Sequence, residues 1–186
     1  LAPHVIVGIG TGEFIDKIFS GIEVNWPADR VPYRPQYVLA DGVYLPELWQ
    51  RVGTDMGLRQ RVRVTVPGTN NVNFRRFAIQ YQAASFDAAT DPSAFGAAGA
   101  YDAVYLLAYA ASVAGSGELT GPRLASALTK LSAGTPFDVG SASISQAFNE
   151  LQRAGQIDLA GASGPLNFEP TRGEAVSDIP VWCLAS

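Results

Sequence analysis

Segments typical of strands are concentrated in the early part of this 186-residue chain. Two β-branched runs, residues 4–10 and 36–42, are each followed by a stretch with the apolar spacing of a helix, 12–22 and 44–53. A third run begins at residue 61 and ends at Pro67. Strands that alternate with helices in this way are typical of a parallel sheet. The sequence therefore predicts an α/β fold.

From residue 72 onward, strand character almost disappears and the chain is predicted to be helical. Asp91 before Pro92, and Thr120 ahead of Pro122, are signals for the start of a helix, and Gly155 is typical of a helix end. Four helices are predicted, over residues 73–85, 91–115, 120–132 and 143–155.

Composition and charge exclude several classes of partner. The net charge of -4 and the pI near 4.9 argue against nucleic acid and against an anionic membrane surface. Arg59, Arg61 and Arg63 come nearest to a basic cluster, but the arginines alternate with valines and are predicted to form the solvated face of a strand. The single cysteine, Cys183, excludes an internal disulfide and is predicted to be an inert core residue.

Residues 94–114 are apolar almost all the way around the predicted helix. Asp102 interrupts this run, and only about a dozen apolar residues follow it, fewer than the roughly 20 that a bilayer requires. We therefore predict a core helix covered on most sides rather than a membrane span. Three strands are too few to cover the apolar faces of all four helices, so we expect other residues to cover them.

Two phrases near the end of the chain are distinctive, AYDAVYLLAYA at 100–110 and GQIDLAGASGPLNFEPTRGEA at 155–175, and IPVWCLA closes the chain at 179–185. Three earlier phrases accompany them in the same order, namely PHVIVGIGTGEF at 3–14, RPQYVLADGV at 34–43 and VTVPGTNNVNF at 64–74. Together they resemble the second half of the type I periplasmic solute-binding proteins, in the branched-chain amino acid (Leu/Ile/Val) group of ABC transporters.

Members of that family have two three-layer αβα lobes joined by three crossing segments, with the solute between the lobes. The resemblance implies a partial fold of this type, its C-terminal half. Residues 1–67 would end the second lobe, 68–175 would be helices and a short strand that complete the first lobe, and 176–186 would return to the second lobe as a strand. The phrase GASGPLNF, 161–168, would be a flexible approach to a short strand. The sheet that covers the helices would precede Leu1.

Ligands of open α/β sheets bind beyond the carboxyl ends of the strands, and two loops there are candidates. In the first loop, Gly10, Thr11 and Gly12 are expected to turn backbone N–H groups and a hydroxyl toward the crevice. In the second, Asp41 and Gly42 follow the next strand, and the resemblance implies that Asp41 accepts the ammonium group of the solute. Family members commonly have an aromatic residue where Thr11 stands, which leaves the solute class open. The alternative is an Asp-Gly turn in which Asp41 caps the following helix.

No catalytic, cofactor or metal site is predicted. Gly8, Gly10 and Gly12 form an incomplete dinucleotide-binding motif, because Glu13 stands where the third glycine is required. The only histidine, His4, has no neighbours in the sequence pattern for general-base work or metal binding, and it is predicted to be structural or superficial.

The resemblance implies a periplasmic or secreted protein, or one with a membrane anchor, that binds an amino acid or a similar small polar solute for an ABC importer. Its partners would be the solute and an ABC permease. A ligand-sensing domain of a receptor or regulator with the same fold is the alternative function. Exposed helical faces also leave open self-association or pairing with a missing N-terminal half.

Overall fold

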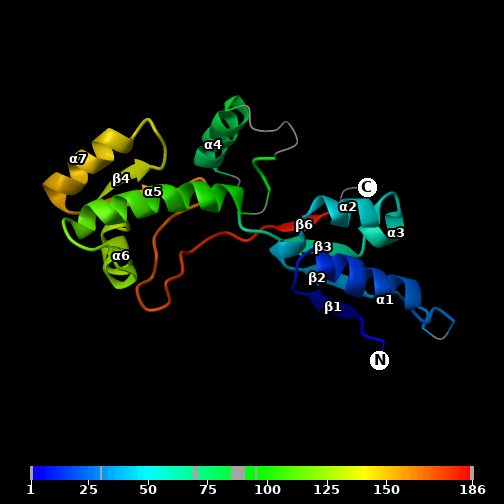
Figure 1. Ribbon diagram of the computed structural model, residues 1–186. Helices are drawn as coiled ribbons and strands as arrows, with labels where there is room; N and C mark the ends of the chain where they lie inside the picture. Colours follow the sequence, from blue (N-terminus) through cyan, green and yellow to red (C-terminus); the bar gives the residue numbers. More distant parts are fainter. Residues whose placement is uncertain (1, 30, 69–70, 85–90, 95, 185–186) are drawn as a thin grey trace. The chain divides into compact units, whose positions relative to one another are not determined.

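The chain is a mixed α/β protein of two compact units, each of which combines strands with helices. The computed structural model describes residues 2–29, 31–68, 71–84, 91–94 and 96–184 (Figure 1). Unit 1 consists of residues 1–67 and 179–186, and unit 2 of residues 68–178. The last boundary therefore lies before Ile179, whereas the resemblance placed it before residue 176.

Unit 1 is built on a four-stranded sheet in the order β1-β2-β3-β6. The strands β1 (Val5–Gly8), β2 (Gln36–Leu39) and β3 (Val62–Thr65) are parallel, and the three strands predicted from the sequence are thereby confirmed. The last strand, β6 (Val181–Cys183), is antiparallel to β3 and forms one edge of the sheet. The other edge is β1.

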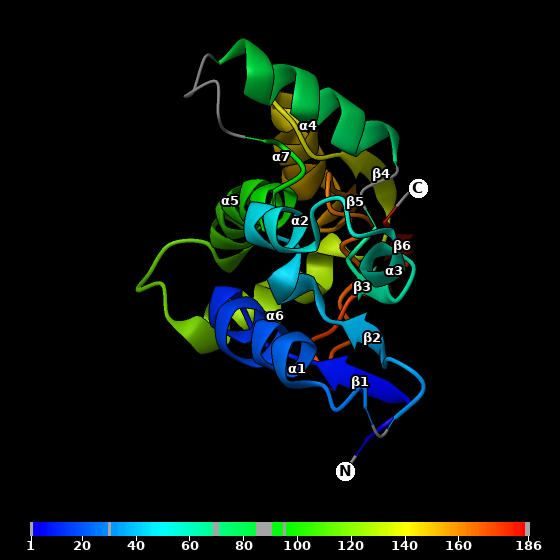
Figure 2. The same cartoon turned by 90° about the vertical axis from the view of Figure 1, so that its right-hand side faces the viewer.

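The helical segments of unit 1 pack on one face of this sheet, as the run of α1 beside β1 and β2 illustrates (Figures 1 and 2). Buried side chains of β2 and β3, from Tyr37 to Val64, meet those of the helices in one apolar core. The three-layer arrangement expected for a lobe is not found among the described residues of unit 1, where Val5 and Val7 on the opposite face are exposed. The helical segments are a π-helical stretch η1 (Phe14–Phe19), α1 (Ser20–Asn25), a 3₁₀ turn η2 (Asp41–Val43), α2 (Pro46–Val52) and α3 (Met56–Arg59).

An ion pair joins α1 to the starts of β2 and β3. The carboxylate of Glu23 accepts hydrogen bonds from Nη1 and Nη2 of Arg61 at 2.9 and 2.8 Å, and from the hydroxyl of Tyr37 at 2.6 Å. Burial raises the pKa of Glu23, but these hydrogen bonds and the charges of Arg61 and Arg34 lower it by more, so the pKa lies below its ordinary value. The pair therefore stabilises unit 1 only while Glu23 is ionised.

This ion pair shows that the predicted solvated arginine face is wrong. The side chain of Arg61 is only 13% exposed, because it reaches across the sheet end to Glu23. Arg59 lies at the end of α3 rather than on the strand, and Arg63 is half-buried. The alternating pattern correctly marks Val62 and Val64 as buried, but the intervening positions find partners within unit 1.

Unit 2 contains the four predicted helices and a small parallel sheet. The sheet pairs β4 (Thr135–Asp138) with β5 (Ile157–Ala160). The sequence predicted almost no strand after residue 72, and β4 was not predicted. Pro136 and a flanking glycine concealed β4 in the sequence, since both residue types are depleted in strands. The helical elements are α4 (Val72–Ala83), α5 (Ala97–Ala114), α6 (Gly121–Leu128), the 3₁₀ turn η3 (Thr129–Leu131) and α7 (Ile144–Ala154).

Two of the three predicted helix ends are confirmed. Thr120 occupies the N-cap of α6, and Gly155 ends α7 with the left-handed φ of 74° that glycine favours. Asp91 does not begin a helix: its side chain accepts a hydrogen bond from the N–H of Ser93 in a local turn, and α5 begins only at Ala97. An Asp-Pro pair suits such a turn as well as a helix start.

Helix α5 is buried on one face only, which corrects the prediction of a helix covered on most sides. Leu106 and Tyr109 face the core of unit 2, whereas Val104 and Leu107 are 67% and 55% exposed. Among the described residues, α5 is the one helix long and apolar enough to cross a membrane, with 28% of that stretch buried. Long apolar helices also occur in the cores of proteins. One face of α5 packs on the core of unit 2 in this way.

A buried carboxylate in the middle of α5 holds the GASG segment. Asp102 is 1% exposed and accepts hydrogen bonds from the N–H groups of Ala162 and Ser163, at 2.9 and 2.7 Å, and from the Ser163 hydroxyl at 2.6 Å. A side chain at Gly161 would collide with that carboxylate. The segment is a tight turn closed between Gly161 and Gly164. The resemblance implied a short strand within GASGPLNF, residues 161–168. This position is wrong, because the strand, β5, ends at Ala160, before the segment.

Cys183 is exposed, which corrects the prediction of a core cysteine. It lies on β6, an edge strand whose three residues are all exposed. An apolar run usually indicates burial, but all three residues of this edge strand are exposed, and even Trp182, whose ring lies 5.7 Å from that of Tyr44, is 48% exposed.

We expect Glu23→Gln to destabilise unit 1 at neutral pH by about 1–3 kcal/mol, because the substitution removes a charge-assisted pair. The pKa of Glu23 is lowered in the folded state, so its contribution is complete above the ordinary value of 4.5 and is lost as pH falls through the folded value. Trp26, Trp49 and Trp182 all lie in unit 1, so tryptophan fluorescence during urea unfolding measures this unit. The free energies of unfolding of the wild type and the variant should differ at pH 7 and become equal in acid. An equal gap at both pH values, or a similar loss in the exposed control Glu47→Gln, would contradict the assignment.

We expect Asp102→Asn to destabilise unit 2 by about 3 kcal/mol, because one oxygen acceptor becomes an amide donor that faces backbone N–H groups. Ser163→Ala removes only the hydroxyl bond and should cost about 1 kcal/mol. Urea unfolding followed by circular dichroism measures both. Equal losses for the two variants would show that the backbone bonds to Asp102 contribute little.

Candidate ligand-binding site

The candidate loops of unit 1 follow the carboxyl ends of adjacent parallel strands. Residues 9–13 come after β1 and residues 40–45 after β2, and the N–H of Ala40 donates to the carbonyl of Gly8 at 2.9 Å. On the next strand, the hydroxyl of Thr65 donates to the carbonyl of Leu39 at 3.2 Å. The three strand ends are therefore aligned, as open α/β sheets require at a ligand site.

The two loops touch through their glycines. A side chain at Gly42 would collide with the carbonyl oxygen of Gly10 and would lie 3.8 Å from the methyl carbon of Thr11. Gly10 is itself restricted, because a Cβ there would stand 2.9 Å from Cβ of Phe14, and Gly8 has no room beside the Phe14 ring. Glycine is thus needed at these positions for close backbone approach.

The carboxylate of Asp41 is partly exposed beside this contact. The N-cap of η2 is Ala40, and the N-cap of α2 is Leu45, and neither helix end receives a side-chain cap. The alternative that Asp41 caps the following helix is therefore wrong. Among the described residues, nothing donates a hydrogen bond to the Asp41 carboxylate, and it forms no ion pair. It is available to a cation from solution.

Thr11 brings a second acid to the loops. Its hydroxyl lies 3.3 Å from Oε2 of Glu13, to which it donates, and both residues are exposed. The sequence marked Glu13 only as a defect in a glycine motif, although its position two residues after Thr11 could have indicated the contact.

The structure brings four of the predicted residues together: Gly10, Thr11, Asp41 and Gly42. Gly12 lies at the margin, where a Cβ would have open space up to a methyl carbon of Leu45 at 4.0 Å. Gly10 and Gly42 have a packing reason for being glycine, and a ligand-binding role for all five residues stays a prediction.

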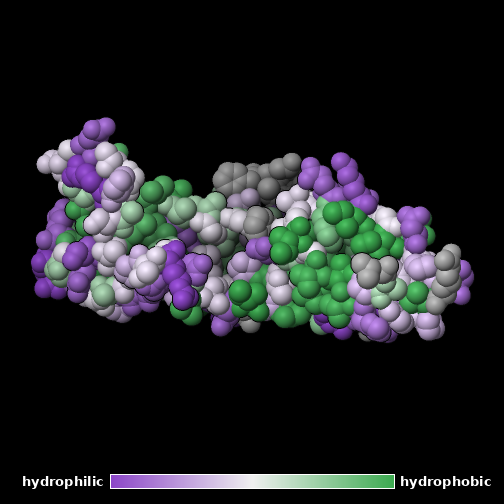
Figure 3. Space-filling view, turned by 90° about the horizontal axis from the view of Figure 1, so that it is seen from below, coloured by the Kyte–Doolittle hydropathy of each residue, from purple (hydrophilic) through white to green (hydrophobic). Residues whose placement is uncertain are grey.

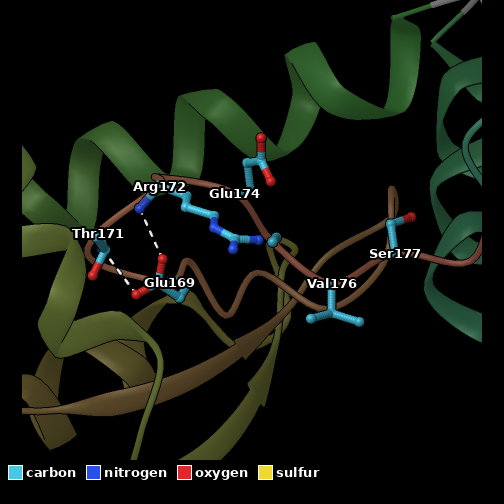
Figure 4. Close-up of a pocket in the computed structure, with 7 residues that line it drawn as sticks. Glu169, Thr171, Arg172, Glu174, Val176 and Ser177 are labelled. Carbon is cyan, nitrogen blue, oxygen red and sulfur yellow. Dashed lines mark hydrogen bonds between the residues drawn. The ribbon is translucent and has the colours of Figure 1, made fainter.

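A separate hollow lies in unit 2, in the segment that follows β5 (Figure 4). Glu169 shapes this segment by accepting hydrogen bonds from the N–H groups of Thr171 and Arg172 at 3.0 and 2.8 Å, and these bonds lower its pKa. None of the predicted site residues lies there, and the Glu169 carboxylate is already used by its own turn. Among the described residues, no group of three or more His, Cys, Asp or Glu side chains is arranged to hold a metal.

Comparisons with protein-family models, with curated proteins and with solved structures found no match to this chain. The likeness to solute-binding proteins therefore depends on the sequence phrases alone.

We expect Gly42→Ala to destabilise unit 1 by about 1–3 kcal/mol, because its methyl group would force the Gly10 carbonyl away. Gly12→Ala is the matched control in the neighbouring loop, where the space is open, and it should change stability by less than about 0.5 kcal/mol. Urea unfolding followed by tryptophan fluorescence compares them. Equal stability of the two variants would show that the loops do not touch.

Proposed function

We propose that this chain is part of a type I solute-binding protein of an ABC importer, and that it binds the ammonium end of an amino acid or a similar small polar solute. The observation that carries the proposal is the unpartnered carboxylate of Asp41, beside the Gly10–Gly42 contact and at the carboxyl ends of parallel strands. This is where the fold class places ligands.

The chemistry of the loops favours a cationic group. A carboxylate that accepts a charge-assisted hydrogen bond from an ammonium group gains roughly 1.5–3 kcal/mol. Glu13 adds a second negative charge near Thr11, and residues 9–13 and 40–45 contain no other charged side chain. An anion such as a phosphate would be repelled at this place, which supports an amine-bearing solute.

The connections between the units also support the proposal. The chain passes from unit 1 to unit 2 after Pro67 and returns before Ile179. On the unit 1 side the N–H of Val66 donates to the carbonyl of Pro180 at 3.1 Å, and on the unit 2 side the N–H of Gly68 donates to the carbonyl of Asp178 at 2.7 Å. The two connections are thus hydrogen-bonded to each other on both sides of the unit boundary, an arrangement suited to a hinge.

The proposed partners follow from this function. The closed, solute-bound form would be presented to an ABC permease, and the protein would act in the periplasm or outside the cell. By the resemblance, the residues that hold the solute's carboxylate lie outside these 186 residues. Binding of an amino acid by this chain alone is therefore expected to be weak, in the millimolar range.

Amide chemical shifts test the proposal, because NMR detects millimolar binding. Leucinamide retains the ammonium group and lacks the carboxylate, and N-acetylleucinamide lacks the charge. Titration with leucinamide should shift the amides of Gly10, Thr11 and Gly42, and N-acetylleucinamide should not. Asp41→Asn should weaken the binding about tenfold or more.

The control is Glu47→Gln, which removes an exposed carboxylate from α2 and should leave the titration unchanged. Equal shifts with the two ligands, or unchanged affinity in Asp41→Asn, would contradict an ammonium site at Asp41.

A further inference from the structure

The candidate site of unit 1 contains two carboxylates and no basic residue. Asp41 lies in the loop after β2 and Glu13 in the loop after β1, and residues 9–13 and 40–45 include no Lys, Arg or His. Among the described residues, no basic side chain forms an ion pair with either acid, not even Lys17, one helical turn after Glu13. A single ammonium group at Asp41 would therefore leave the charge of Glu13 without a partner.

Thr11 connects the Glu13 carboxylate to the contact between the loops. Its hydroxyl donates to Oε2 of Glu13 at 3.3 Å, and its methyl carbon would lie 3.8 Å from a Cβ at Gly42. The carbonyl oxygen of Gly10, which a Cβ at Gly42 would meet, adds a partial negative charge at the same place. Glu13 and the loop of Asp41 thus adjoin the same threonine side chain, and one extended solute can contact both loops.

Glu13 has an alternative role at the start of a helix. It occupies the N-cap of η1, where the helix dipole favours a negative charge, but its side chain makes no cap hydrogen bond there. The carboxylate contacts the Thr11 hydroxyl instead. An acid that served only the helix would not affect which amine binds at the site, so ligand preference separates the two roles.

The loop after β1 also offers an apolar contact. Ile9, directly before Gly10, is 81% exposed, and Val7 is 68% exposed. Figure 3 shows apolar side chains gathered over one side of unit 1. An exposed apolar side chain in an acidic loop suits a molecule that carries its charges on a hydrocarbon chain, because burial of that chain adds to the attraction between the charges.

We propose that this site takes a solute with two cationic groups on one short alkyl chain, as in a basic amino acid or a diamine. Asp41 accepts one ammonium group, and the second ammonium group lies at Glu13. This inference rests on the proposed function, because it requires the ammonium site at Asp41, and it adds the charge class of the solute. An apolar side chain such as that of leucine would leave Glu13 unused.

Titrations followed by amide chemical shifts test the inference with two amines. Cadaverine has two ammonium groups, and pentylamine has the same carbon chain with one. Salt at about 0.15 M screens the attraction between distant charges, so a difference in affinity reports direct contacts. Both amines should shift the amides of Gly10, Thr11 and Gly42. After correction for its two equivalent ends, cadaverine should bind about threefold to fivefold more tightly, the gain expected from one exposed ion pair.

Three variants assign the two charges. Glu13→Gln should abolish the preference for cadaverine and leave the affinity for pentylamine unchanged, whereas Asp41→Asn should weaken the binding of both amines. Glu47→Gln removes an exposed acid from α2 and should keep the preference. Circular dichroism establishes that each variant is folded.

A comparison of lysinamide with norleucinamide distinguishes the two sources of the second charge. A preference for lysinamide at least as large as that for cadaverine assigns the site to a basic amino acid. A preference confined to cadaverine assigns the site to a diamine.

The possible failures of the two proposals differ. Equal affinity for cadaverine and pentylamine, with both weakened in Asp41→Asn, overturns the second cationic group and leaves the ammonium site intact. A preference that survives Glu13→Gln overturns the role of Glu13. Absence of shifts with both amines, or shifts that Asp41→Asn does not reduce, overturns the proposed function together with this inference.

Discussion

The close approach of Gly42 to the Gly10 carbonyl is the constraint on which the candidate site depends. It allows the loop after β1 and the loop after β2 to meet, and so it brings Thr11 close to Gly42, the residue that follows Asp41. A side chain at Gly42 would separate the loops. At the opposite ends of β2 and β3, the ion pair between Glu23 and Arg61 joins α1 to the sheet. Unit 1 is thus stabilised at both ends of its strands. The Asp41 carboxylate lies at the carboxyl ends, and among the described residues it has no hydrogen-bond or ion-pair partner.

In unit 2, a buried carboxylate joins a helix to a turn. Asp102 would be costly to bury alone, but the turn at residues 161–164 supplies three donors to it, which ties α5 to the segment after β5. The opposite face of α5 remains apolar and exposed. Both units therefore combine a well-formed core with an apolar surface that no described residue covers, in β1 of unit 1 and in α5 of unit 2.

The sequence predicted the local elements better than their surroundings. The β-branched runs and the spacing of apolar residues were sufficient for β1, β2, β3 and the four helices of unit 2, because these signals are local. Arg61, Cys183 and the outer face of α5 were assigned wrongly, since burial depends on what lies across the sheet or the helix. Asp41 and Thr11 could be named from strand ends, but the meeting of their loops depends on Gly42. The only sequence signal for the contact of Thr11 with Glu13 was their spacing of two residues.

A nuclear Overhauser effect between the loops after β1 and β2 tests most directly whether the two loops form one site. A Cβ at Gly42 would stand 3.8 Å from the methyl carbon of Thr11, so an α proton of Gly42 must lie close to that methyl group. We predict an observable cross-peak between the Gly42 α protons and the Thr11 methyl protons in the folded chain. Absence of this cross-peak, with both resonances assigned and sharp, would contradict a single site formed by the two loops.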